Sequence, residues 1–170
     1  MNMHLRNVTD DDLAIIERWL HAEHVCRAWG EPGANLRLFR EPPSKENGRA
    51  MVEAERHAVG VVLWQHPTRE ELDAAGLADI PTSVIDIDII IGERSALGRG
   101  VGSNAIRLVA EAALSDASVP FVMACARFDN LASQRAFTKA GFRKDREFDD
   151  VPDGRYVLMV LHRPEAPPHE

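Results

Sequence analysis

The segment IDIDIIIGERSALGRGVGSNAI, residues 85–106, constrains the fold more than any other part of the chain. It runs from a β-branched stretch through three alternating glycines and then into a run with helical spacing. Backbone amides at the start of a helix can bind an anion, and Gly98, Gly100 and Gly102 have no Cβ to keep a ligand away from them. The segment therefore predicts a strand–loop–helix unit with a phosphate or pyrophosphate site. Arg99 can add a charged contact to it.

Two familiar phosphate loops are excluded by the spacing. The pattern GxxxxGK[ST] is absent, and the glycines follow GxGxG rather than GxGxxG. A flexible glycine-rich turn without a ligand is the alternative interpretation.

The rest of the chain predicts an α/β fold around a mixed sheet, because some strands are linked by hairpins and others by helices. Hydrophobic patterns favour strands at 50–55, 58–65, 84–91, 120–126, 142–148 and 156–161. Helices are expected between Thr9 and Gly30, over 103–117 and over 130–140. The segment 31–48 is expected to be a loop with at most a short turn at 36–39, and the first hairpin should turn at Arg56–His57. Residues 1–163 then form one domain, with a turn at 152–154 and a flexible tail at 164–170.

Charge and composition narrow the class of protein. The net charge of −7 argues against a nucleic-acid surface and suits a cationic small substrate. The sequence has neither an apolar run that could span a membrane nor a signal-peptide core at its start, so we expect a cytoplasmic protein without a membrane partner. Cys26 and Cys125 have no metal spacing and are expected to be free thiols; no metal site is predicted. His21 and His24, three residues apart, are expected on the surface.

Two motifs together resemble one family. LGRGVGS after a strand resembles the pyrophosphate loop of the GNAT acyltransferase superfamily, and DNLASQRAFTKAGFRK resembles its downstream motif N-x-x-[AS]-x-x-x-Y-x-K-x-G-F. The resemblance extends from Leu5 to Leu161. It implies a central mixed sheet of six to seven strands with splayed parallel strands, flanked by about four helices. Within the superfamily, the 6′-type aminoglycoside N-acetyltransferases look most similar, through the tryptophan before Gly30 and the ungapped segment 87–102.

The resemblance also implies where acetyl-CoA would bind. The loop amides from Leu97 to Ser103 would hold the pyrophosphate, and the strand backbone of Ile89 to Ile91 would pair with the pantetheine arm. The full set of expected cofactor residues is Ile89, Ile90, Ile91, Leu97, Gly98, Arg99, Gly100, Val101, Gly102, Ser103, Asn130, Ser133, Phe137 and Lys139.

The acids of the central strand are the candidate substrate residues. Asp86 and Asp88 share one strand face with Ile90, while Ile85, Ile87, Ile89 and Ile91 share the other. From spacing alone, a cationic ligand, a solvated face and a pairing arginine all remain open. The resemblance places Asp88 where the aminoglycoside enzymes carry a catalytic aspartate, so we expect it to bind the substrate ammonium and take its proton. Asp86 would help to hold a polycation.

The chain departs from the family pattern at two positions. Phe137 stands where many members carry a tyrosine that protonates the leaving thiolate, so we expect solvent or the ammonium to supply that proton. Cys125 stands where the aminoglycoside enzymes tend to have an acid near the substrate. A smaller amino sugar of the kasugamycin kind, acetylated at its 2′-amine, is therefore an alternative to a 6′-amine. Trp29 is expected as an aromatic wall for a sugar ring, or else as a core residue.

Three functions remain in view. The leading prediction is an acetyl-CoA-dependent acetyltransferase that modifies a cationic amino sugar, an aminoglycoside antibiotic, and so confers resistance. A GNAT enzyme that acetylates another amine, such as a protein N-terminus, a lysine or a siderophore precursor, is the second. A non-catalytic CoA-binding sensor is the third. The oligomeric state is expected to be a monomer or a homodimer.

Overall fold

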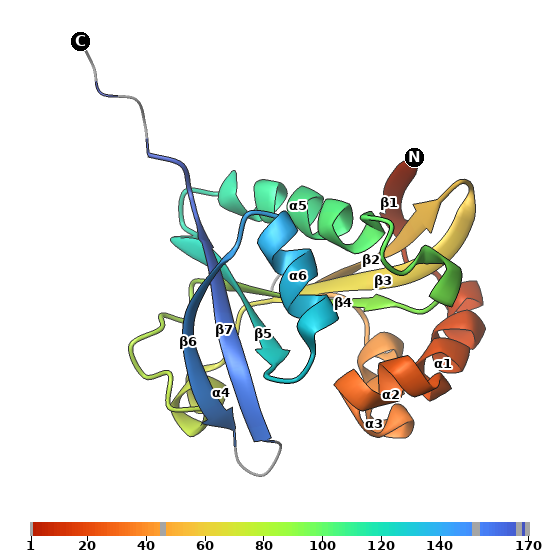
Figure 1. The fold of residues 1–170 in the computed structure, drawn as a ribbon, viewed down its shortest axis with the longest axis horizontal. Helices are drawn as coiled ribbons and strands as arrows, with labels where there is room; N and C mark the ends of the chain where they lie inside the picture. Colours follow the sequence, from red (N-terminus) through yellow and green to blue (C-terminus); the bar gives the residue numbers. More distant parts are fainter. Residues whose placement is uncertain (1, 45–46, 151–153, 166–167, 169–170) are drawn as a thin grey trace.

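Seven strands form a single mixed sheet in the computed structural model, which describes residues 2–44, 47–150, 154–165 and 168 (Figure 1). The strands are β1 (Met3–Asn7), β2 (Asn47–Ala54), β3 (His57–Gln65), β4 (Ile85–Ile91), β5 (Phe121–Arg127), β6 (Arg143–Asp150) and β7 (Gly154–His162). The helices are α1 (Leu13–His21), α2 (Glu23–Trp29), α3 (Pro32–Arg40), α4 (Arg69–Ala74), α5 (Val101–Leu114) and α6 (Leu131–Lys139), with 3-10 turns η1 (Asp10–Asp12) and η2 (Arg94–Ala96).

The strand order is β1-β2-β3-β4-β5-β7-β6, and β4 and β5 are the parallel neighbours in it. These two strands pair only at Ile85 with Val122 and at Asp86 with Met123, and then they separate. β3 continues to pair with β4 as far as Ile91, and β7 pairs with β5 as far as Arg127. The expected splay of the parallel strands is confirmed.

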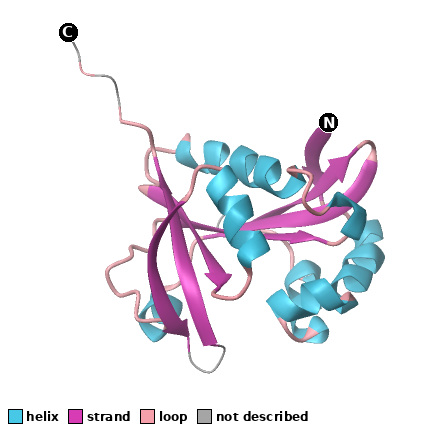
Figure 2. Ribbon diagram, in the orientation of Figure 1, coloured by secondary structure: helices cyan, strands magenta, loops and turns pink. Residues whose placement is uncertain are grey.

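The two faces of the sheet carry different helices, as Figure 2 shows. On one face α5 and α6 pack over a core that includes Ile87, Ile106, Val122 and Phe137. The other face holds two separate clusters. In the first cluster Ile90 packs with α1–α3. In the second, Met123 packs with Leu158 and with α4 and the loop that follows it, through Leu72, Leu77 and Ile80.

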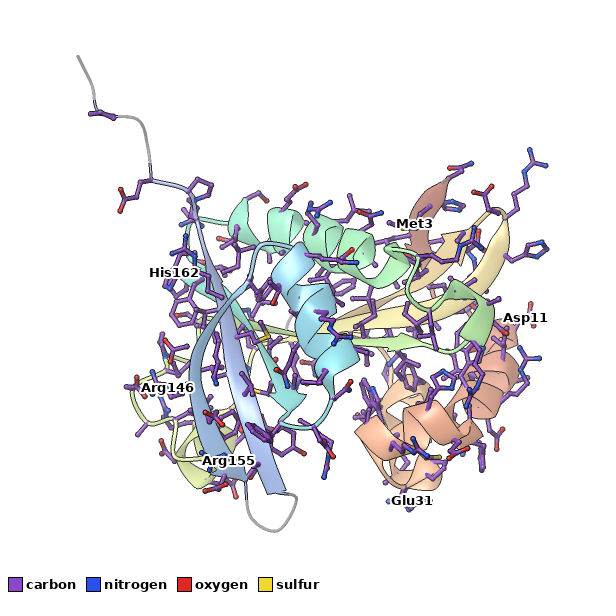
Figure 3. The ribbon with its side chains drawn as sticks, viewed as in Figure 1. Met3, Asp11, Glu31, Arg146, Arg155 and His162 are labelled. Carbon is purple, nitrogen blue, oxygen red and sulfur yellow. The ribbon has the colours of Figure 1, made fainter. Side chains whose placement is uncertain are left out.

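Asp86 and Asp88 project between these two clusters, because strand neighbours at i and i+2 share a face with Ile90 and the rung partner Met123. The loop after α4 is tied to β6, because Arg146, which is labelled in Figure 3, donates to both carboxylate oxygens of Asp79 at 2.8 Å. Asp86 and Asp88 therefore form an acidic strip on β4, and the clusters of Ile90 and of Met123 are the apolar walls on either side of it.

The N-terminal region differs from the sequence prediction. The expected single helix is divided into η1, α1 and α2, and the expected loop at 31–48 contains the nine-residue helix α3 and the start of β2. Pro32 occupies the first turn of α3, and the Glu31 carboxylate accepts hydrogen bonds from the amides of Gly33 and Ala34. The described residues therefore hold six α-helices rather than about four.

Three further features correct or limit the prediction. β1 was not expected; it is a short edge strand paired with β2. The first hairpin turns at Glu55 and Arg56, which both adopt positive φ, rather than at Arg56–His57. The predicted turn at 152–154 and most of the predicted tail lie outside the described residues.

Candidate active site

The fork between β4 and β5 is the geometric centre of the candidate site. Beyond the rung of Asp86 and Met123, the inner edges of both strands lack a strand partner. On the β3 side, the Gly92 amide donates to the Val59 carbonyl at 2.9 Å. The alternation of an antiparallel ladder then directs the backbone groups of Ile90 toward β3 and those of Ile89 and Ile91 toward the fork. A linear ligand with amide groups can therefore pair with Ile89 and Ile91 but not with Ile90.

His24 also reaches this edge, which corrects the expectation of a surface histidine. Its Nε2 lies 2.9 Å from the Ile91 carbonyl oxygen, and its Nδ1 is buried without a hydrogen-bond partner in the described part of the chain. With the proton on Nε2, the ring donates to Ile91. His21, three residues earlier, is exposed as expected. Sequence spacing gave no signal for the difference, because the contact joins α2 to β4 across 67 positions.

The glycine loop follows β4 and ends at the N-terminus of α5. Gly98 and Gly100 adopt φ of 73° and 80°, a conformation that a residue with a side chain adopts only at a cost. A Cβ on Gly98 would meet no heavy atom within 4 Å and would project into open space. The first intrahelical hydrogen bond of α5 runs from the Asn104 amide to the Gly100 carbonyl. The amides of 101–103 therefore have no partner within the helix. This arrangement fits an anion held on main-chain donors.

Side chains of the loop contribute less than its backbone. The Ser103 hydroxyl donates to the Gly100 carbonyl at 3.0 Å and is 6% exposed, so it stabilises the turn. Arg99 and Leu97 are exposed. Arg99 also lines a groove of about 480 Å³ with Glu55, His57 and Glu93.

The downstream motif lies on α6, across the fork from β4. Asn130 caps this helix, since its Oδ1 accepts from the Ser133 amide at 3.1 Å. Phe137 is 3% exposed and meets Phe142 edge to face, with ring centroids 5.1 Å apart. The structure therefore places Phe137 in the core and away from open surface. Lys139 is exposed and lines a shallow cavity of about 330 Å³ along α6.

Asp86 and Asp88 are half-buried on the acidic strip. Burial raises the pKa of Asp88 to about 6, because the charged form loses hydration there. Burial also raises the pKa of Asp86 well above its ordinary value, and the charges of Asp88 and Glu71 raise it further. Asp88 can therefore exchange a proton near neutral pH, which is the property that a general base needs.

Cys125 projects from β5 on the same face as Met123 and hence on the face of the acids. Both cysteines are free thiols, as expected. Burial raises the pKa of the Cys125 thiol well above its ordinary value, and the charges of Asp86, Asp88 and Asp150 add to the shift. The thiol is therefore neutral at physiological pH and is a poor nucleophile.

Trp29 ends α2, beside the apolar cluster that contains Ile90, and it is half-buried. Its carbonyl accepts a hydrogen bond from the Asn35 side chain at 2.7 Å. Asp150 was not singled out from the sequence, whereas the acids at 70–73, which include Glu71, were expected mainly to solvate a helix face, with a substrate role as the lesser alternative. The fold brings α4 and β6 near the site, so that the charge of Glu71 raises the pKa of Asp86 and the charge of Asp150 raises the pKa of Cys125.

The comparison with known proteins agrees with this geometry. The chain is 27% identical over 169 residues to aminoglycoside N(6′)-acetyltransferase type 1 from Klebsiella pneumoniae and to the enzyme of the same name from Serratia marcescens. Each match covers 94% of this chain and 82% of the relative. A crystal structure of aminoglycoside acetyltransferase AAC(6′)-Ib in complex with coenzyme A and kanamycin has the same fold, with a TM-score of 0.78, 24% identity and 95% coverage of both chains.

No helix in the described residues is both long enough and apolar enough to cross a membrane. The family model described as an acetyltransferase (GNAT) domain matches residues 8–150, which include the fork, the glycine loop and the downstream motif. The chain belongs to the GNAT acetyltransferase family.

Proposed function

We propose that this chain transfers the acetyl group of acetyl-CoA to an amino group of an aminoglycoside antibiotic and thereby confers resistance. One observation carries the proposal: Asp88, with a pKa of about 6, lies on the strand whose free edge leads to an anion-binding glycine loop. Such an arrangement brings a proton acceptor and a long, anionic acyl carrier to the same strand. The similarity to aminoglycoside N(6′)-acetyltransferases supports an amino sugar as the acceptor.

The fork and the loop fit a coenzyme with a diphosphate and an amide-bearing arm. The amides of Val101, Gly102 and Ser103 would hold the diphosphate, while Leu97, Gly98, Arg99 and Gly100 would shape the loop around it. The backbone groups of Ile89 and the amide of Ile91 would orient the arm, while the Ile91 carbonyl is held by His24. From α6, Asn130, Ser133 and Lys139 would contact it. When bound, acetyl-CoA supplies an activated acetyl thioester.

Asp88 is proposed as the general base. It binds the ammonium group of the substrate, takes one proton from it directly or through water, and leaves a neutral amine to attack the thioester carbonyl. Because the Cys125 thiol stays protonated, we propose direct transfer to the amine without an acetyl-enzyme on this residue. No tyrosine occupies position 137, so solvent or the departing ammonium proton would neutralise the thiolate.

The acidic strip and its walls define the acceptor class. Asp86 and Asp88 would bind ammonium groups, Cys125 would border them, and Trp29 would provide an aromatic wall for a sugar ring. The reacting amine is the 6′-amine of an aminoglycoside or the 2′-amine of a kasugamycin-like amino sugar. We propose a cytoplasmic enzyme that acts as a monomer or a homodimer.

Release of free CoA thiol tests the proposal. The enzyme is mixed with acetyl-CoA and, in turn, kanamycin, ribostamycin, kasugamycin, spermidine and an unmodified peptide. Thiol release with an aminoglycoside or kasugamycin, with a mass gain of one acetyl group on the sugar, is the expected result. Release with the peptide or spermidine alone would assign a different amine. Tight coenzyme binding without release for any amine would assign a sensor, which the absence of a tyrosine at position 137 would favour.

A further inference from the structure

Asp86 is the polar side chain that the fold explains least. Its Oδ1 is buried and has no hydrogen-bond partner among the described residues. It lies on the last rung shared by β4 and β5, directly before the fork, and faces the space between the two apolar clusters. A buried carboxylate oxygen without a partner is costly, typically by about 1–3 kcal/mol. The Ile87 amide acts on this carboxyl group as a hydrogen-bond donor, but Oδ1 needs a further donor that the described residues do not supply.

Over the part of the chain that the structure describes, the charged groups that act on the Asp86 carboxyl group are acids, and no cation is among them. Asp88 follows Asp86 on β4, and Glu71 of α4 adds a second charge. Cys125 on β5 is a neutral thiol that also senses Asp150 of β6. Gln65, its rung partner on β3, carries no charge. The arginines of α4 and β5 have other partners: Arg69 donates to Asp73 at 3.0 Å, and Arg127 is 3.8 Å from Asp129 and lies over the Tyr156 ring. The missing donor is therefore a cation rather than a neutral group.

We propose that Asp86 is a second ammonium site beside Asp88, so that the enzyme selects acceptors with two ammonium groups about 7 Å apart, the advance of two strand residues. One ammonium group binds at Asp88 and loses the proton that precedes acetyl transfer. The other binds at Asp86 and stays charged. This inference rests on the proposed function, because it takes Asp88 as the residue that receives the reacting amine.

Binding of the second ammonium group has a proton balance that can be measured. In the free protein, burial and the nearby acids raise the pKa of Asp86, so its carboxyl group holds a proton to a higher pH than an exposed aspartate does. An adjacent ammonium group stabilises the carboxylate, and the carboxyl proton passes to the buffer. No bond other than this O–H bond breaks at Asp86.

Calorimetry with two matched probes tests the site without acetyl transfer. The probes are 1,5-diaminopentane and 5-amino-1-pentanol, which differ by an ammonium group in place of a hydroxyl. Their amines titrate near a lysine pKa of about 10.4, so at pH 7.5 a released proton comes from the protein. Titrations in two buffers with different ionisation enthalpies give the number of protons released.

The wild-type enzyme should bind the diamine about tenfold to hundredfold more tightly than the amino alcohol, as expected for one buried charge-assisted hydrogen bond. The diamine should also release up to about one additional proton. Asp86→Asn should abolish both differences. Glu70→Gln on the exposed side of α4 removes the same charge and should preserve them.

Equal wild-type affinity for the two probes would overturn the proposal without any variant. Proton release that persists in Asp86→Asn would also overturn it. These outcomes are separate from failure of the proposed function, which shows as an absence of acetylated aminoglycoside. An enzyme that acetylates kanamycin but does not discriminate between the probes would keep the function and lose the second site.

Discussion

Asp86 lies opposite Met123 on the rung at which β4 and β5 part, and Asp88 is the next residue on the same face. The point of separation therefore places the two acids at different depths relative to the fork. Asp86 sits at the closed end, whereas Asp88 sits beside the first unpaired backbone. The two acids share one face of β4, so their different positions along the strand assign them different tasks.

The pH dependence of the reaction should report Asp88. Its carboxylate must be ionised to accept a proton, and burial raises its pKa to about 6. We expect kcat/KM to fall as pH drops below about 6. Asp88→Asn should lower kcat by about a hundredfold to ten-thousandfold, the usual contribution of a general base. Steady-state rates from pH 5 to 9 measure both effects. A variant with nearly wild-type rates across this range would remove Asp88 from the mechanism.

Asp86 should lower the free energy of unfolding of the protein at high pH. Its pKa is raised in the folded state, so folding favours the protonated carboxyl group. The contribution of Asp86 to the free energy of unfolding is therefore greatest below its ordinary pKa of 3.8. This contribution is lost as pH rises through the raised pKa. Asp86→Asn cannot ionise and should unfold at a temperature about 2–8 °C higher than wild type at pH 8, from relief of roughly 1–2 kcal/mol.

The difference between Asp86→Asn and wild type should shrink toward pH 4, where Asp86 is protonated in the folded chain and partly protonated in the unfolded chain. Thermal unfolding followed by circular dichroism at pH 4, 6 and 8 gives the comparison. An advantage of the variant that is greatest at pH 4 would contradict the direction of the shift.

Cys125 should be dispensable for the chemical step. Burial and nearby acids keep its thiol protonated, so it cannot carry an acetyl group efficiently. Cys125→Ala should retain kcat within about tenfold, since no step of general-base transfer passes through sulfur. Mass spectrometry of the wild-type enzyme with acetyl-CoA and no amine should detect no acetylated protein. An acetyl adduct that disappears in Cys125→Ala would instead establish a two-step reaction.

Gly98 and Gly76 provide a matched pair for testing the loop. Their φ angles are 73° and 72°, and at both positions a new Cβ would meet no heavy atom within 4 Å. Alanine at either position should therefore destabilise the fold by a similar amount, about 1 kcal/mol, through backbone strain. Only Gly98 lies in the proposed diphosphate loop. Gly98→Ala should weaken CoA binding by about tenfold or more in calorimetry, as expected when a contact worth at least 1.4 kcal/mol is lost. Equal CoA affinity for the two variants would exclude this loop.

The sequence correctly predicted those features of the site that depend on residues close together in the chain. The alternation along 85–91 correctly places Asp86, Asp88 and Ile90 on one face and the other isoleucines on the face covered by α5, and the glycines correctly mark the start of α5. The signal for α3 was present but misread, because prolines suggested a loop whereas Pro32 occupies a first helical turn. Contacts between distant segments had no local signal. The length of the fork, the position of His24 on Ile91 and the approach of Glu71 to Asp86 all depend on tertiary packing.

Gly92 should be as intolerant of substitution as any position in the described chain, although it directly follows the most regular strand. A Cβ there would lie 2.0 Å from the Trp19 ring, and Trp19 is 2% exposed with its Nε1 donating to Glu93 at 2.9 Å. The indole cannot move without losing its packing and its hydrogen bond. Gly92→Ala should therefore lower the free energy of unfolding by about 1–3 kcal/mol or more, the usual cost of overpacking a core.

The double variant Gly92→Ala with Trp19→Ala separates this clash from other causes. Removal of the indole ring leaves space for the new methyl group, so the double variant should lose less stability than the sum of the two single changes. Urea unfolding of the four proteins gives the coupling energy. Strict additivity would mean that the two residues do not compete for the same space, contrary to the close approach of Trp19 to the backbone that joins β4 to the candidate site.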